Sequence, residues 1–136
     1  MNLHDPSKMI FVFGSNLSGI HGAGAAAYAR KHRGAVMGVG EGLTGQAYAL
    51  PTKGHQISFM PLDDIYKHVQ KFMKFACNER NELQFQITRV GTGLSGFRDN
   101  DISLMFEYVA HKNSNCFFDT AWRHLLPEDA KFWGTG

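Results

Sequence analysis

The chain has 136 residues, a formal net charge of +2, and 43% hydrophobic and 19% charged residues, a composition that excludes a disordered or low-complexity protein. This length fits one domain spanning residues 1–136. The longest apolar stretches fall far short of the roughly 20 residues that cross a bilayer, so no membrane segment is expected. The N-terminus has no secretory signal pattern, so we expect a cytoplasmic protein. The basic residues are scattered and give no strong nucleic-acid signal.

The first predicted unit is a strand, a glycine-rich loop and a helix. The apolar run at residues 9–13 predicts a strand buried on both faces. Four alanines within residues 24–32 predict a helix, which Gly34 ends. We expect the basic residues 30–33 to interact with the C-terminal dipole of this helix rather than to bind phosphate.

The middle of the chain predicts two further strands and a long helix. A glycine-rich connection at residues 38–45 leads into a strand at 47–50, which Pro51 is expected to end. Another short strand is expected at residues 56–59. After Pro61, apolar residues at i, i+3 and i+4 spacing from Leu62 to Ala76 predict an amphipathic helix.

The last third predicts strands at residues 83–90 and 116–118, joined by a helix that Asp99 or Asn100 caps and that runs to Val109. The tail from residue 127 is expected to be peripheral. Tyr28 and Trp122 are expected in the core. Cys77 and Cys116 lack a Cys-x-x-Cys spacing, so we expect two buried free thiols, no metal and no cofactor.

Strands that alternate with helices predict an α/β fold of three layers, α/β/α, with a mostly parallel central sheet and helices on both faces. Glycine makes up about 11% of the chain, against a usual ~7%. Eight glycines lie between Gly14 and Gly42, and three more between Gly91 and Gly96. Each main cluster follows a strand directly. Because ligands bind at the carboxyl ends of parallel strands, we expect the two clusters to form two walls of one cleft.

The first loop, residues 14–27, has the composition of an anion site. Its glycines and alanines leave backbone N–H groups accessible, and the following helix directs its positive N-terminal dipole toward the loop. A phosphate or pyrophosphate fits this chemistry best. The alternative is a tight turn that packs a helix of small residues against the sheet.

The second loop contains Gly91-x-Gly93-x-x-Gly96, the dinucleotide fingerprint, and Asp119 follows the next strand as a possible ribose ligand. In that fingerprint the helix begins within the glycines, whereas here Phe97 and Arg98 come before the helix cap. A Rossmann dehydrogenase is therefore the weaker alternative. The P-loop motif and the Gly-x-Ser-x-Gly elbow of serine hydrolases are absent from the sequence.

Together the two loops resemble the macro domain, a family that binds ADP-ribose. The matching segments are Asn16-x4-His21-Gly22-x-Gly24-x-Ala26 and Thr92-Gly93-Leu94-Ser95-Gly96-Phe97. The Asn-x4-His-Gly spacing resembles RNA-virus macro domains that remove ADP-ribose or act on ADP-ribose 1''-phosphate. The chain as a whole, over residues 10–122, is most similar to small stand-alone macro-like proteins of tailed phages and bacteria. For a phage protein the compartment would be the host cytoplasm.

The resemblance implies a role for each matching residue. Asn16 would bind the distal ribose, and His21 would lie near the reacting anomeric carbon. Phe97 would pack against the ribose. The backbone around the ribose and diphosphate would come from both loops, at Gly22, Ala23, Gly24, Gly91, Thr92, Gly93, Leu94, Ser95 and Gly96.

The implied function is hydrolysis of ADP-ribose 1''-phosphate or of an ADP-ribosyl linkage. Asn16 and the diphosphate of the substrate would position the attacking water, and His21 would orient the reacting group. The implied partners are ADP-ribose or a related nucleotide and ADP-ribosylated macromolecules. The alternative is a non-catalytic ADP-ribose reader or a protein that sequesters a nucleotide signal. Each of the two residues also has an alternative of its own: Asn16 forms only an Asx turn, and His21 is an ordinary exposed loop histidine.

Overall fold

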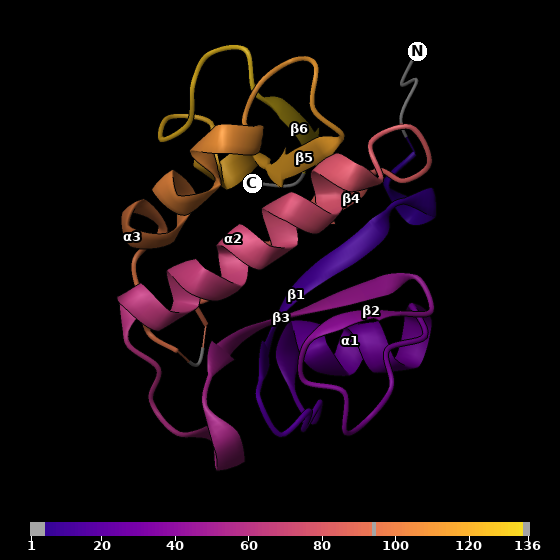
Figure 1. Ribbon diagram of the computed structural model, residues 1–136, viewed down its shortest axis with the longest axis vertical. Helices are drawn as coiled ribbons and strands as arrows, with labels where there is room; N and C mark the ends of the chain where they lie inside the picture. Colours follow the sequence, from indigo (N-terminus) through magenta and orange to yellow (C-terminus); the bar gives the residue numbers. More distant parts are fainter. Residues whose placement is uncertain (1–4, 94, 135–136) are drawn as a thin grey trace.

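A computed structural model describes residues 5–93 and 95–134 and shows an α/β fold around a six-stranded, mostly parallel sheet (Figure 1). The strand order is β2-β3-β1-β4-β5-β6, and only the edge strand β2 is antiparallel to its neighbour. The strands are β1 (Ile10–Asn16), β2 (Gly42–Thr44), β3 (Ala47–Lys53), β4 (Phe85–Ile87), β5 (Cys116–Asp119) and β6 (Lys131–Gly134). The helices of the described chain are α1 (Gly24–His32), α2 (Leu62–Asn78) and α3 (Asp99–Ser103).

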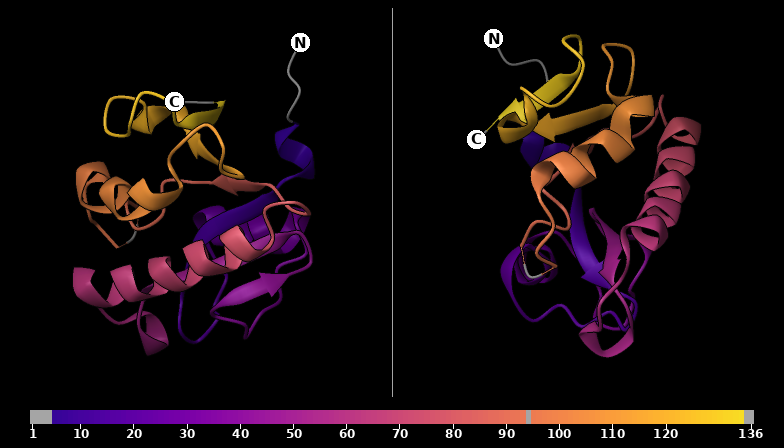
Figure 2. Two further views of the ribbon diagram at one scale, coloured as in Figure 1. Left: turned by 45° about the horizontal axis from the view of Figure 1, so that its top comes forward. Right: turned by 90° about the vertical axis from the view of Figure 1, so that its left-hand side faces the viewer.

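Strand β1 lies inside the sheet and is covered on both faces, as its apolar sequence predicts. Phe11 and Phe13 pack on one face in a small cluster with Ala29 of α1. Ile10 and Val12, which point the opposite way, belong to the larger core beneath α2. The two helices accordingly lie on opposite sides of the sheet (Figure 2).

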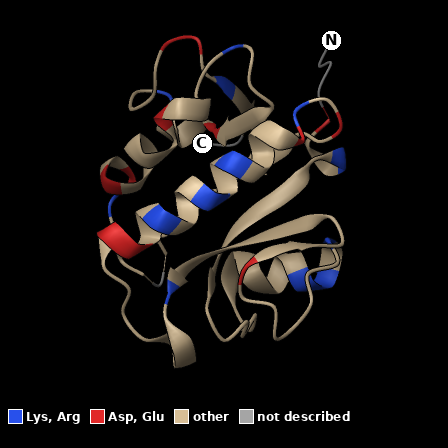
Figure 3. Cartoon of the chain, viewed as in Figure 1, with Lys and Arg blue, Asp and Glu red and all other residues tan. Residues whose placement is uncertain are grey.

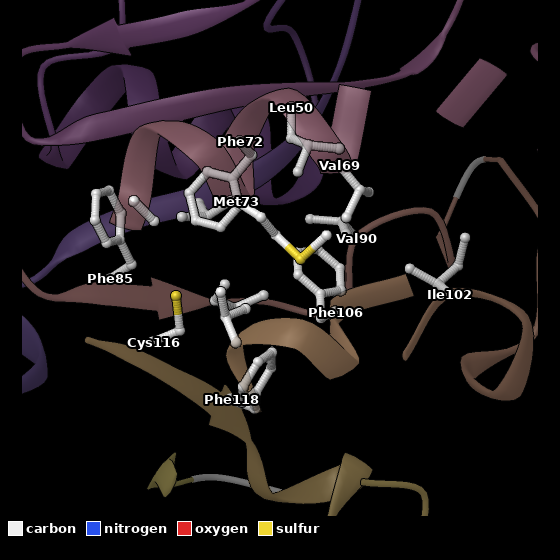
Figure 4. Close-up of a cluster of buried hydrophobic side chains, with 14 of the residues drawn as sticks. Leu50, Val69, Phe72, Met73, Phe85, Val90, Ile102, Phe106, Cys116 and Phe118 are labelled. Carbon is white, nitrogen blue, oxygen red and sulfur yellow. The ribbon is translucent and has the colours of Figure 1, made fainter. Parts of the chain in front are cut away.

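The larger core is built around aromatic rings that α2 brings onto the sheet. Every buried residue of α2 belongs to the predicted apolar stripe, which confirms the helical periodicity. The ring of Phe72 lies 5.2 Å from that of Phe85 on β4 and 6.1 Å from that of Phe106 (Figure 4). Burying one such side chain contributes about 1.5–3 kcal/mol, so this contact fixes α2 across the sheet.

Two predictions for the middle of the chain are wrong. Pro51 does not end its strand, because β2 pairs with β3 only as far as Ala49 and the missing N–H of Pro51 leaves no ladder partner unsatisfied. The expected strand at residues 56–59 is instead a 3₁₀ turn, His55–Ile57, followed by extended backbone.

The last third also departs from expectation. The helix after the second glycine cluster has Arg98 as its N-cap, with Asp99 inside it, and a 3₁₀ helix, Leu104–Val109, continues it. The strand predicted at residues 83–90 is shortened to β4. The tail expected to be peripheral supplies β6, which pairs in parallel with β5.

Exposure corrects two further predictions. Trp122 is fully buried as expected, but Tyr28 on α1 is 44% exposed. Cys116 is buried, and burial raises the pKa of its thiol, whereas Cys77 near the end of α2 is exposed.

None of the described helices has the length and apolar character needed to cross a membrane.

Candidate functional site

The glycines of the first cluster at positions 19, 34, 38, 40 and 42 are not among the cavity-lining residues. Gly14, Gly22 and Gly24 of that cluster line, together with Gly91 and Gly93 of the second, one cavity of about 580 Å³ at the carboxyl ends of β1, β3 and β4. This confirms the prediction that they form two walls of a single cleft. The juxtaposition follows from the sheet order, because β1 lies between β3 and β4 and all three strands are parallel. Residues 22–26 form one wall, and residues 91–93 with Ser95 form another.

The start of α1 faces the cavity without a side-chain cap. Ala23 occupies the N-cap position and makes no side-chain hydrogen bond, so the first-turn N–H groups have no acceptor from a capping side chain. A Cβ built on Gly22 or Gly24 would meet no atom within 4 Å. Backbone donors, a positive dipole end and open space therefore coincide here, which is the arrangement that binds phosphate.

Two cations line the cavity, Lys53 at the end of β3 and Arg89 after β4, and none of the described lining residues is acidic. Arg89 also forms a bidentate pair with Asp99, through Nε to Oδ1 at 2.8 Å and Nη2 to Oδ2 at 2.6 Å. These hydrogen bonds raise the pKa of Arg89 and lower the pKa of Asp99. Lys53 has no ion-pair partner in the described part of the chain, so its charge is available to an anion in the cavity.

Asn16, at the end of β1, lines the cavity and also holds the first loop. Its Nδ2 donates to the carbonyl oxygen of Ile20 at 2.9 Å, and its Oδ1 accepts from the backbone N–H of Ile20 at 3.0 Å. The loop-holding role expected of an Asx residue is therefore present. An amide has two N–H groups, so one donor is left over for a ligand.

The structure does not bring His21 to the cavity. Its side chain is fully buried, its ring packs edge-on against Phe13 at 5.1 Å, and Nε2 lies 3.0 Å from the carbonyl oxygen of Val39. With Nε2–H donating to that carbonyl, Nδ1 is a buried atom without a hydrogen-bond partner. The imidazole thus lies beneath the first loop and not beside a reacting group in the cleft.

The second loop is anchored to β3 and to the core. The hydroxyl of Ser95 lies 3.1 Å from both the carbonyl oxygen and the hydroxyl of Thr52. Gly91 has a φ of +79°, and a Cβ there would come within 3.0 Å of Ile102, so only glycine fits. These contacts hold the loop against the end of the sheet, where it faces α1.

Two described residues expected in the second wall, Gly96 and Phe97, are not placed there. Gly96 and Phe97 are not among the cavity-lining residues, and the Phe97 ring instead lies 5.9 Å from that of Phe59. Leu94 lies outside the described residues. Asp119, the ribose ligand of the dinucleotide alternative, does not line this cavity and accepts a hydrogen bond from the N–H of Ala121.

Sequence reasoning missed several lining residues, among them Lys53, Thr52, Thr88 and Arg89. The available signal was position, since each lies at or just beyond the carboxyl end of β3 or β4. The basic residues 30–32 lie in the last turn of α1, where the interaction with its C-terminal dipole was expected. Arg30 also donates through Nε to the carbonyl oxygen of His21 in the first loop at 3.1 Å. Arg33 is buried and donates to the carbonyl oxygen of Met9 and to the side chain of Gln86.

No protein-family model, curated protein sequence or solved structure matches this chain. Functional conclusions therefore depend on the chemistry of the cavity.

Proposed function

We propose that this protein binds ADP-ribose, or a nucleotide derivative that likewise carries a diphosphate, in the cavity between its two glycine loops. One observation carries the proposal: the uncapped start of α1 faces a second glycine loop across a cavity lined by Lys53 and Arg89 and by no acidic residue among the described lining. Its volume, about 580 Å³, is that of a small-molecule site.

The proposed binding mode divides the ligand between the two walls. The backbone at Gly22, Ala23 and Gly24 donates to one phosphate, and the second loop, at residues 91–93 and Ser95, binds the diphosphate from the other side. Asn16 directs its remaining N–H toward the distal ribose. A strand that ends in Asn16, followed by an uncapped helix of small residues and flanked by parallel neighbours, supports a three-layer macro-like architecture.

Burial of His21 favours a binder over a hydrolase that uses this imidazole. The charged lining residues are Lys53 and Arg89, and both are cations that suit anion binding better than proton abstraction. Hydrolysis of an ADP-ribose 1''-phosphate or ADP-ribosyl linkage remains the second candidate, because Asn16 reaches the cavity and would position a water beside the substrate's own diphosphate. Both candidates bind the same ligand, and both would also bind macromolecules to which ADP-ribose is attached.

Calorimetric titration with ADP-ribose, paired with a turnover assay on the same sample, tests both candidates. Adenosine, which lacks phosphate, is the matched control and is expected to bind far more weakly. ADP-ribose binding without release of phosphate from ADP-ribose 1''-phosphate, or of ADP-ribose from a modified protein, supports the binder. Turnover supports the hydrolase. Equal affinity for adenosine and ADP-ribose, or no binding of ADP-ribose, contradicts the proposal.

A further inference from the structure

Residues 54–59, between β3 and α2, contain an unusual backbone conformation at the edge of the cavity. Gln56 and Ile57 have φ angles of 53° and 61°, and they are the two non-glycine residues with positive φ in the described chain. This region is uncommon for any residue with a Cβ and most unfavourable for a β-branched one such as isoleucine. The turn is therefore strained at two successive positions.

The strained turn contacts the first loop and the residue that follows the second loop. The backbone N–H of Gln56 donates to the hydroxyl of Ser18 in the first loop at 2.8 Å. On the other side, the ring of Phe59 lies 5.9 Å from that of Phe97, which follows the second loop. Within the turn, the N–H of Gly54 donates to the carbonyl oxygen of Ser58 at 2.8 Å. Contacts with the surrounding chain thus hold the turn in place.

Burial in the core does not explain why the chain keeps an isoleucine here. The Ile57 side chain is 42% exposed and lines the cavity, whereas the neighbouring Gln56 does not line it. Ile20 of the first loop also lines the cavity and is exposed to the same extent. Strained non-glycine residues concentrate at ligand sites, where the side chain rather than the backbone is needed.

We infer that Ile57 is a specificity-determining residue whose strained backbone holds an apolar side chain in the lining of the phosphate-binding cavity, which Ile20 also lines. It selects ligands that carry a non-polar ring face, such as a nucleoside, next to their phosphate groups. This inference depends on the proposed function, because it assigns the ring-bearing part of the same ligand. Inorganic pyrophosphate, which has no ring, gains nothing from the Ile57 side chain.

Three variants separate the side chain from the strain. Ile57→Ala removes most of the side chain but keeps a Cβ at positive φ, and Ile57→Gly removes both. Gln56→Gly is the matched control, because it relieves strain at the neighbouring position without changing the cavity lining. Each is titrated calorimetrically with ADP-ribose and with inorganic pyrophosphate, and its Tm is measured without ligand.

Both Ile57 variants are expected to weaken ADP-ribose binding about tenfold, as expected for loss of part of one aliphatic contact. Pyrophosphate affinity is expected to stay unchanged in all three. Ile57→Gly and Gln56→Gly are expected to raise the Tm by about 2–5 °C. If Ile57→Gly binds ADP-ribose with unchanged affinity, or loses affinity for both ligands equally, the inference about Ile57 is wrong while the proposed function stands. Wild-type protein that binds neither ligand overturns the proposed function as well.

Discussion

The side-chain amide of Asn16 pairs with the backbone of Ile20 through two hydrogen bonds, of 2.9 and 3.0 Å. The pairing closes the chain that follows β1 into a loop whose shape depends on one side chain. Because the next residues lead into α1, this loop sets where the helix begins relative to the cavity. The same amide lines the cavity, so Asn16 links the folding of the loop to the chemistry of the site.

Replacing Asn16 is therefore expected to affect both stability and binding. Asn16→Ala removes both hydrogen bonds and leaves the N–H and C=O of Ile20 without them, at a cost of about 2 kcal/mol in the free energy of unfolding. Asn16→Asp keeps the acceptor for the N–H of Ile20, but it places a carboxylate against the carbonyl oxygen and in the anion cavity. We expect Asn16→Asp to bind ADP-ribose more weakly than Asn16→Ala, although its loop loses only one hydrogen bond.

Urea unfolding and calorimetry on these two variants separate the effects. If Asn16→Asp instead binds ADP-ribose more tightly than Asn16→Ala does, and as tightly as the wild type, the ligand does not place negative charge near Asn16.

The position of the site could be predicted from sequence because parallel strands place their carboxyl ends at one edge of the sheet. Each of the two glycine clusters follows such a strand, so the clusters meet if the two strands lie near one another. The strands are β1 and β4, which are neighbours in the sheet. The direction of individual side chains could not be predicted in the same way. His21 follows Ile20 and precedes Gly22, both of which line the cavity, yet its ring points under the loop to Phe13. The direction in which the His21 side chain points depends on tertiary contacts.

The wrong elements share a physical origin. Residues 56–59, in which Ile57 and Phe59 alternate with polar residues, favour a strand by their pattern, but Ser18 and Phe97 on distant parts of the chain hold them as a turn. Lys53 and Arg89 carry no motif and act only through their position at strand ends. The tertiary structure places these two residues at the cavity, so their role could not be predicted from the sequence alone.

The ion pair beneath the second loop predicts a pH-dependent contribution to stability. Asp99 accepts from Arg89 and, at 2.8 Å, from the indole N–H of Trp122. The hydrogen bonds from Arg89 are the main cause of its lowered pKa. A carboxylate whose pKa is lowered by folding stabilises the fold at pH values above its ordinary pKa of about 3.9. That stabilisation is lost as the pH falls through the lowered pKa.

Asp99→Asn is therefore expected to cost about 1 kcal/mol at neutral pH, a value limited by the partial exposure of the pair. The difference from the wild type is expected to shrink in acid, when the wild-type carboxyl also becomes neutral. Urea unfolding of both proteins at pH values from neutral to acid measures this difference. Asp64→Asn, which breaks an exposed pair with Lys67, is the control and is expected to cost less. A difference that stays constant with pH would contradict the assignment.

Lys53 is expected to contribute long-range attraction for the ligand. Lys53→Gln keeps a polar side chain but removes the charge, and we expect ADP-ribose binding to weaken about tenfold at low salt and by less at high salt. Lys71→Gln removes the same charge from the outer face of α2, where lysines follow one another along the helix (Figure 3) and Lys71 pairs with Glu41 at 3.3 Å. Calorimetry at two salt concentrations is expected to give wild-type affinity for Lys71→Gln. Equal losses in the two variants would indicate a general charge effect.

Gly22 offers the sharpest separation of binding from folding. Its φ is not positive and a Cβ would meet no protein atom within 4 Å, so Gly22→Ala is expected to leave the Tm unchanged or slightly higher. The added methyl would occupy open space at a residue that lines the cavity, where in the proposed binding mode a phosphate lies against the backbone. We therefore expect ADP-ribose affinity to fall, and to fall further in Gly22→Val. Gly24→Ala, at a φ of +56°, is the contrasting variant, because it is expected to lose stability as well as affinity. If Gly22→Val keeps both its Tm and its affinity, the start of α1 does not contact the ligand, and the proposed binding mode is wrong.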